Sequence, residues 1–149
     1  MPQFTLQSPV GLLTLTEENG AIVSLVFGGT AETPPPTPLL REAQRQLNAY
    51  FSAELQNFDL PLFPRGTPFQ QSVWQQLRAV PYGQTRTYAE IAAAVGKPNA
   101  CRAVGMASHR NPIAIVIPCH RVIGSDGSLT GYAGGLERKQ TLLRLEQQK

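Results

Sequence analysis

The sequence has few of the residues that build disulfide-linked or metal-bound scaffolds. It contains two cysteines and two histidines in 149 residues: Cys101, His109, Cys119 and His120. A structural zinc site usually needs four such ligands at suitable spacing, and here one Cys and one His are immediately adjacent. We therefore expect no metal and no cofactor.

Long apolar runs, low-complexity tracts and internal repeats are absent too. No stretch approaches the roughly 20 apolar residues of a membrane span. The first ten residues, MPQFTLQSPV, lack the basic flank and apolar stretch of a secretory signal. We predict a soluble cytoplasmic protein without a membrane partner, in which a structural disulfide is unfavourable because that compartment keeps thiols reduced.

Acidic residues are scarce in the second half of the chain. Residues 1–64 carry two Arg against six acidic residues, a balance of −4, whereas residues 65–149 carry eleven Lys or Arg against four, a balance of +7; together they give the net charge of +3. A basic half indicates a polyanionic partner or a solvated basic surface, and charge alone does not separate the two.

The first 64 residues predict a small β-sheet and one helix. Apolar residues alternate through the first thirty positions, and Asn19-Gly20 is a typical hairpin turn. Four prolines make 30–38 a loop. Apolar residues then recur at helical spacing from Leu40 to Phe51. This half forms our first predicted domain, 1–64. Its end belongs to an extended connection over 57–66, which leads to the second domain.

The second predicted domain, 65–149, is mainly helical, which makes the fold class α/β of the α+β kind. Thr67 with Gln70, and Thr87 with Glu90, are capping boxes that start two helices. Another helix is expected from about Asn99 to His109 after a short turn that contains Gly96 and Pro98. Such a pair of helices is the helix-turn-helix pattern, which is often only a packing unit. The run IAIVI, 113–117, predicts a short buried strand that Pro118 ends.

Cys119 follows this apolar run and precedes His120. A cysteine at the end of a buried strand, beside a turn and a histidine, is placed as many catalytic nucleophiles are. A nearby base raises the fraction of reactive thiolate. The alternative from the residues alone is a buried, inert cysteine that packs as a small hydrophobe.

Several ordered motifs extend this interpretation: FQQSVW, PYGQTRTYAEIA, RAVG, NP, IPCHRV and GYAGGL. Over about 66–149 the sequence closely resembles the O6-alkylguanine-DNA alkyltransferase family. The resemblance implies direct-reversal DNA repair. Such a protein would act once and would take an alkyl group from O6 of guanine, or O4 of thymine, onto its own cysteine.

The resemblance also implies roles for individual residues. Cys119 would accept the alkyl group, His120 would draw off its proton through a water, and Glu146 would orient that histidine. Asn111 would join the recognition helix to the active-site turn, and Tyr88 would donate to the departing guanine and help rotate the 3′ phosphate. The pocket wall would comprise Tyr132, Ala133, Gly134, Gly135 and the backbone of Val122.

The implied partner is double-stranded DNA that contains O6-alkylguanine, bound through the minor groove by a monomer. Arg102 would enter the base stack while the damaged nucleotide is flipped out. Ala103 and Gly105 lie on the same small-residue helix, which suits a narrow groove. Ala133 stands where some relatives carry serine, so only backbone contacts to O6 are available there.

Three alternatives remain at this stage. A protein that only flags alkylated DNA would need no thiolate. A helix-turn-helix regulator would prefer one DNA sequence, and a cysteine hydrolase would turn over repeatedly.

Overall fold

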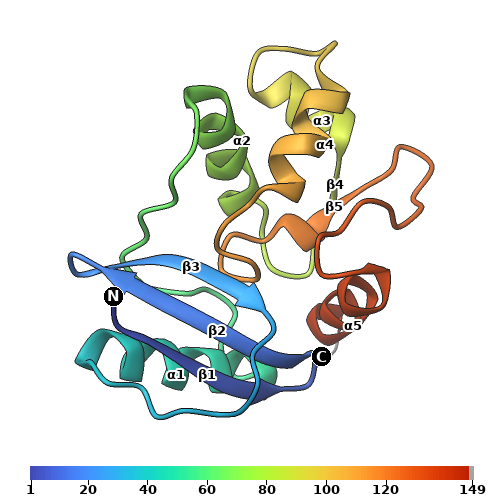
Figure 1. Cartoon of the computed structure of the whole chain (residues 1–149). Helices are drawn as coiled ribbons and strands as arrows, with labels where there is room; N and C mark the ends of the chain where they lie inside the picture. The colour runs from blue at the N-terminus through green and yellow to red at the C-terminus, as the bar shows by residue number, and fades with distance from the viewer. Residues whose placement is uncertain (148–149) are drawn as a thin grey trace. The chain divides into compact units, whose positions relative to one another are not determined.

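The computed structural model describes residues 1–147, which form two compact units. The first comprises Met1–Pro64 with Pro112–Ala114, and the second comprises Arg65–Asn111 with Ile115–Gln147. Together they make the mixed α/β fold expected from the sequence (Figure 1). None of the helices in the described part of the chain is long and apolar enough to cross a membrane.

Three antiparallel strands in the order β1-β2-β3 form the sheet of the first unit: β1 (Gln3–Ser8), β2 (Gly11–Glu18) and β3 (Ala21–Phe27). Asn19 (φ 52°) and Gly20 (φ 79°) both adopt positive φ at the second hairpin. That conformation is what a two-residue type I′ turn requires, so the predicted hairpin is confirmed. Alternate residues of each strand fill the core, among them Phe4, Leu13 and Leu25.

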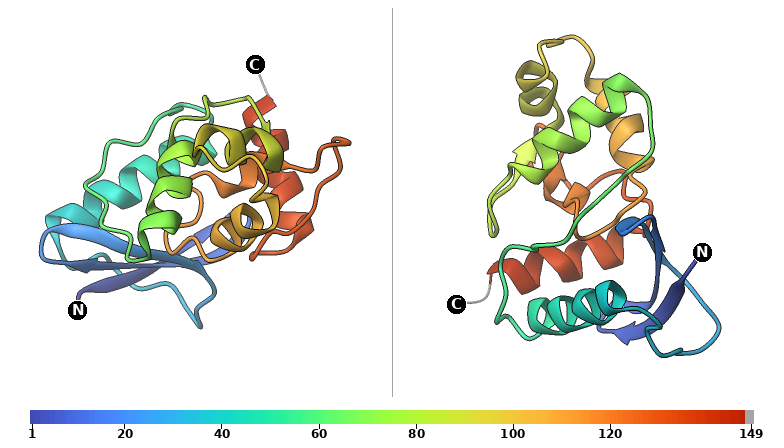
Figure 2. Two further views of the ribbon diagram at one scale, coloured as in Figure 1. Left: turned by 90° about the horizontal axis from the view of Figure 1, so that it is seen from above. Right: turned by 90° about the vertical axis from the view of Figure 1, so that its left-hand side faces the viewer.

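Helix α1 (Pro38–Phe51) packs against β1 and β2 (Figure 2). The Thr37 hydroxyl accepts from the Leu40 amide at 3.1 Å and caps the helix. Pro38 was expected in the preceding loop but is the first helical residue, where proline loses nothing because that amide has no helical partner. Leu40 and Leu47 are completely buried on the inner face of α1.

Three helices build the upper part of the second unit: α2 (Pro68–Arg78), α3 (Tyr88–Ala94) and α4 (Cys101–His109). Both predicted capping boxes are present, at the starts of α2 and α3. Helix α4 packs against α2 and α3, and the Trp74 indole donates to the Ala107 carbonyl at 2.8 Å. The connection between α3 and α4 spans 95–100, longer than expected, because 99 and 100 are not helical.

The remaining elements are a two-stranded parallel ribbon, a short 3₁₀ turn and the last helix. These are β4 (Arg86–Thr87), η1 (Cys119–Arg121), β5 (Val122–Ile123) and α5 (Leu136–Gln147). The pairing of β4 with β5 had no signal in the sequence, since two residues are too few to show periodicity.

The strand predicted over 113–117 is wrong. Ile113 makes an isolated bridge with Leu25, and 114–116 form a turn in which Ile115 has φ 71°. All five residues are nevertheless buried. Burial of a short apolar run is compatible with a strand or a packed turn, and periodicity cannot separate them.

Candidate active site

The cysteine at the start of η1 is almost fully enclosed, with 6% of its surface exposed. Asn111 Nδ2 donates to the Ile117 carbonyl at 2.8 Å and to Sγ of Cys119 at 3.2 Å. One amide therefore links the end of the α4 region to the turn that carries the thiol. Burial raises the pKa of Cys119 to about 11, although the Asn111 hydrogen bond and the charge of Lys139 oppose the rise. The thiol is thus protonated at neutral pH.

His120, the next residue in the chain after this cysteine, forms a buried pair with Glu146 of α5. Nε2 of His120 lies 2.7 Å from Oε2 of Glu146, and neither side chain is exposed. Burial lowers the pKa of His120 more than the carboxylate raises it, so the imidazole is neutral. Nδ1 of His120 has no hydrogen-bond partner among the described residues. A neutral imidazole with an uncommitted nitrogen can accept a proton.

Arg121 was given no role from the sequence, yet it completes this cluster. Its Nε donates to Glu146 Oε1 at 2.8 Å, and its Nη2 to Oε2 at 3.0 Å. Its Nη1 donates to the Val80 carbonyl at 2.8 Å, and its guanidinium lies 5.7 Å from the centre of the Tyr82 ring. Burial raises the pKa of Glu146, but hydrogen bonds from His120 and Arg121 outweigh it and bring the pKa to about 2. Arg121 therefore keeps Glu146 ionised inside the protein.

Lys139 is the second residue whose role the sequence did not reveal. It is completely buried, and its Nζ donates to the carbonyls of Val122 (2.5 Å) and Thr130 (2.8 Å). Burial lowers the pKa of Lys139 to about 8, and the electrostatic interaction with Cys119 opposes this fall. This cation holds both ends of the loop from β5 to Thr130. The sequence left open whether Lys139 lies near the pocket, and the packing of α5 places it in the interior.

The expected pocket wall lies in the segment before α5. Tyr132 is 8% exposed, and burial raises the pKa of its hydroxyl above the usual value of 10.0. Ala133 is exposed, and Gly134 accepts from Arg138 Nη1 at 3.2 Å. The Gly135 amide donates to the Tyr132 carbonyl at 3.0 Å and closes a turn. Val122, completely buried, already presents its carbonyl to Lys139.

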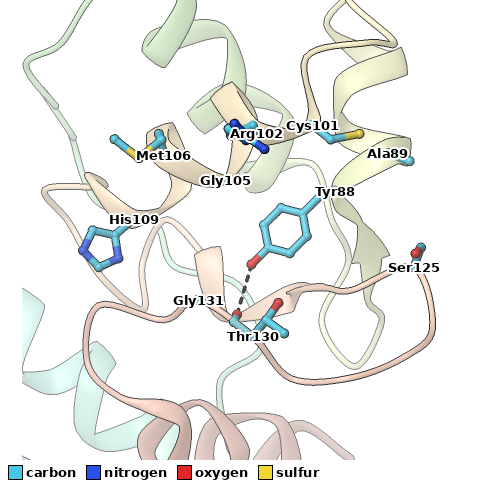
Figure 3. A pocket seen from close by; sticks show the side chains of 10 residues that line it. All are labelled: Tyr88, Ala89, Cys101, Arg102, Gly105, Met106, His109, Ser125, Thr130 and Gly131. Atoms are coloured by element: carbon cyan, nitrogen blue, oxygen red, sulfur yellow. Dashed lines mark hydrogen bonds between the residues drawn. The ribbon is translucent and has the colours of Figure 1, made fainter.

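Tyr88, the first residue of α3, reaches across to the same segment. Its hydroxyl donates to the Thr130 carbonyl at 3.1 Å, as the dashed line in Figure 3 marks. Lys139 Nζ lies 6.0 Å from the centre of its ring. The tyrosine thus joins the helix-turn-helix region to the loop that Lys139 fastens.

The outer face of α4 borders a pocket of about 710 Å³. Arg102, Gly105, Met106 and His109 contribute to it from α4, opposite Tyr88 and Thr130 (Figure 3). Of the sequence-predicted DNA-binding residues, Arg102, Gly105 and Tyr88 are therefore brought together. Ala103 is exposed on the same helix but does not line the pocket.

The pocket and the cysteine are separate features in this structure. The described residues that line the pocket do not include Cys119, Val122 or Tyr132. Within residues 1–147, no three His, Cys, Asp or Glu side chains gather where they could hold a metal ion.

The geometry defines a class of protein in which a buried cysteine, beside a His–Glu–Arg cluster, is joined to a helix-turn-helix with a basic outer face. Two family models match: "6-O-methylguanine DNA methyltransferase, ribonuclease-like domain" over residues 3–64 and "6-O-methylguanine DNA methyltransferase, DNA binding domain" over residues 68–148. The chain belongs to the 6-O-methylguanine DNA methyltransferase family, the O6-alkylguanine-DNA alkyltransferases that the sequence motifs indicated.

Individual relatives and solved structures indicate the same family. A methylated-DNA–protein-cysteine methyltransferase of Methanosarcina barkeri is 54% identical, covering 95% of this chain and 94% of the relative. One of Mycolicibacterium paratuberculosis is 51% identical, covering 95% and 90%. The crystal structure of Mycobacterium tuberculosis OGT in complex with DNA has a TM-score of 0.89 and 51% identity, covering 97% of this chain and 92% of that one.

Proposed function

We propose that the chain repairs DNA by taking the alkyl group from O6 of guanine, in duplex DNA, onto Sγ of Cys119, once per molecule. The observation that carries the proposal is the buried Cys119 on the same 3₁₀ turn as His120 and Arg121, which both pair with Glu146, in a chain of this family. A protein that only flags alkylated DNA needs no such cluster, so that alternative is not favoured.

The first step is removal of the thiol proton. His120 Nδ1 is the atom available to accept it, through a water, because Nε2 is held by Glu146. Glu146 is ionised and stabilises the imidazolium that forms. Since the pKa of the thiol is about 11 in the free protein, we expect the thiolate to form during the reaction and not before it.

In the second step the thiolate attacks the alkyl carbon in line with the bond to O6. A carbon–sulfur bond forms, the carbon–oxygen bond breaks, and its electron pair leaves with guanine, which then takes up a proton. Tyr88 is placed to supply a hydrogen bond or that proton. To do so it must exchange the Thr130 carbonyl for the base. The thioether has no easy reversal, which makes the reaction stoichiometric.

The guanine would be read largely by backbone groups. The amides of Ala133 and Gly134 would face O6, because the Gly135 amide is committed to Tyr132. The carbonyls of Cys119 and Val122 would accept from the guanine amino group. A carbonyl has two lone pairs, so Val122 can serve both Lys139 and the base.

Delivery of the base to a buried cysteine requires that it leave the duplex. Arg102 is exposed on the outer face of α4, where it can fill the space that the flipped nucleotide vacates. Ala103 and Gly105 allow close approach in the minor groove, whose degenerate pattern suits a protein that must scan any sequence. O4-alkylthymine as a second substrate, action as a monomer and location beside the chromosome are parts of the same proposal.

The test is intact-protein and peptide mass after mixing the protein with excess duplex that contains one O6-methylguanine. We expect a gain equal to one CH₂ per chain, located on the peptide of Cys119, after which repair stops. Cys101→Ser, which removes the other cysteine, should gain the same mass, and Cys119→Ser should gain none. Methylation elsewhere, or continued repair by Cys119→Ser, contradicts the proposal.

A further inference from the structure

One large apolar side chain lies exposed in the middle of a basic helix face. Met106 is 53% exposed. The other exposed residues of α4 and its C-cap lie at helical spacing on the same side: Arg102, Ala103, His109 and Arg110. An exposed methionine among cations adds nothing to solubility. Its position raises the question of what it contacts.

The surroundings of Met106 fit a polyanion. Between Glu90 and Asp126 the sequence contains no acidic residue. None of the ten side chains that line the pocket beside Met106, all of them in the described part of the chain, is acidic. Figure 3 shows Met106, Arg102 and His109 on α4 at the border of this pocket. The charge therefore favours DNA over an apolar protein partner at this surface.

We propose that Met106 is a further DNA-contacting side chain of α4, which packs against deoxyribose and base edges in the minor groove beside Arg102. The proposal rests on the proposed function, since it uses the same face of α4. Methionine is one of the apolar residues that proteins place against or between base steps in this groove. Its flexible thioether chain can follow an uneven surface without a fixed geometry.

The spacing of residues along α4 predicts where on the DNA Met106 makes its contact. Arg102 and Met106 are four residues apart, which is about 6 Å along a helix axis. Successive base pairs are about 3.4 Å apart. The two side chains therefore cannot enter one base step. With α4 lying along the groove, Met106 meets the DNA about two base pairs from the step that Arg102 occupies.

An apolar contact and an ionic contact respond differently to salt. Phosphate contacts release counterions, so each one adds to the slope of log affinity against log salt concentration. Truncation of Met106 should lower affinity equally at all salt concentrations and leave the slope unchanged. Loss of Arg110, an exposed cation at the end of α4, should reduce the slope by about one.

The first experiment measures binding of undamaged duplex and single-turnover transfer from O6-methylguanine duplex, over a range of salt concentrations. We expect Met106→Ala to bind roughly five- to twentyfold more weakly with an unchanged slope, and to reach the normal transfer rate at saturating DNA. Met106→Leu should bind nearly as the unaltered protein does. Val26→Ala, which truncates a similarly exposed apolar residue on the sheet (48% exposed), is the matched control and should change nothing.

The second experiment locates the contact. Met106→Cys in a chain that also carries Cys101→Ser and Cys119→Ser has one thiol, which can form a disulfide with a thiol tethered in the minor groove. Yield should be highest when the tether lies about two base pairs from the lesion.

The outcomes separate the two proposals. Normal binding by Met106→Ala, or no preferred crosslink position, overturns the role of Met106 while leaving the repair function intact. Failure of the unaltered protein to bind duplex or to gain a methyl group overturns the proposed function itself. A reduced salt slope for Met106→Ala would show that the variant disturbs the cations and would also overturn the apolar contact.

Discussion

Nε2 of His120 lies 2.7 Å from Oε2 of Glu146, inside the protein, where neither side chain is exposed. Because Glu146 has a pKa of about 2, it is ionised and can only accept hydrogen bonds. The proton of the neutral imidazole is therefore assigned to Nε2, and Nδ1 keeps its lone pair. The pair fixes the tautomer that a general base beside Cys119 needs.

Glu146→Gln tests that arrangement. The amide keeps the shape of the side chain but removes the charge that stabilises the imidazolium and balances Arg121. We expect single-turnover methyl transfer to slow by roughly a hundredfold or more, while binding of undamaged duplex is retained. A buried cation without its partner should also lower the free energy of unfolding, by roughly 3–5 kcal/mol.

Glu137→Gln is the matched control, because Glu137 is exposed in the first turn of the same helix. It should transfer methyl groups at the normal rate. Normal transfer by Glu146→Gln would remove Glu146 from the mechanism.

Acid stability should depend on the same carboxylate. The pKa of Glu146 is about 2 in the folded protein against an ordinary 4.5, so on acidification the unfolded chain takes up the proton first. The stability that Glu146 contributes is thus complete above pH 4.5 and is lost as the pH falls towards 2. Chemical denaturation at several pH values should show a steeper loss over this window for the unaltered protein than for Glu146→Gln. Identical slopes would contradict the low pKa.

Lys139→Met should impair transfer without removing the DNA-binding face. The variant leaves the Val122 and Thr130 carbonyls without their buried donor and removes a cation whose charge lowers the pKa of Cys119. We expect transfer at saturating DNA to fall by roughly tenfold or more, since each unit by which the pKa of Cys119 rises lowers the thiolate fraction tenfold. Arg144→Met, an exposed position of the same helix, is the control. Slower binding with normal transfer would place Lys139 outside the active site.

The parts of this fold that the sequence predicted well depend on neighbours in the chain. The capping boxes at Thr67 and Thr87 and the Asn19-Gly20 turn each need only two to four residues to form their hydrogen bonds. Local chemistry therefore determines them whatever the rest of the chain does. The apolar run 113–117 shows the reverse, because its buried turn is decided by what packs around it.

The active-site residues also differ in whether neighbours in the chain or long-range packing place them. The adjacency of Cys119 and His120 is visible in the sequence, but Glu146 lies 26 residues from His120, and only the family resemblance suggested the pairing. Arg121 was given no role from the sequence, and the sequence did not decide whether Lys139 lies near the pocket. Their burial follows from long-range packing of α5 on the 3₁₀ turn, which has no periodic signature.

Gly105→Ala should change stability and DNA binding in opposite directions. A Cβ at Gly105 would lie 3.9 Å from the Tyr88 ring, an ordinary contact, so the protein itself does not require glycine there. Alanine in a helix is more stable than glycine by roughly 0.5–1 kcal/mol. We expect thermal unfolding at a slightly higher temperature together with weaker duplex binding, because in the proposed complex the added methyl group would lie between α4 and the DNA. Unchanged DNA affinity would show that α4 does not approach the DNA closely at this residue.

Methylation of Cys119 should destabilise the protein. Its Sγ lies in an enclosed turn, 3.2 Å from the Asn111 amide that also holds the Ile117 carbonyl. An added methyl group must displace a neighbour, and overpacking of this kind typically costs about 1–3 kcal/mol. In a protein of this size that corresponds to a fall in Tm of roughly 3–10 °C.

Scanning calorimetry of the methylated protein, after removal of the DNA, measures the effect. The DNA must be absent because a ligand of the folded state would raise Tm and hide the loss. Cys119→Ser treated with the same duplex is the control and should keep its own Tm. Because Asn111 joins the turn to the end of α4, the same methyl group should loosen α4, the helix proposed to contact DNA, and release the used protein from the repaired duplex. An unchanged Tm with tight binding after methylation would show that the turn absorbs the group without transmitting it.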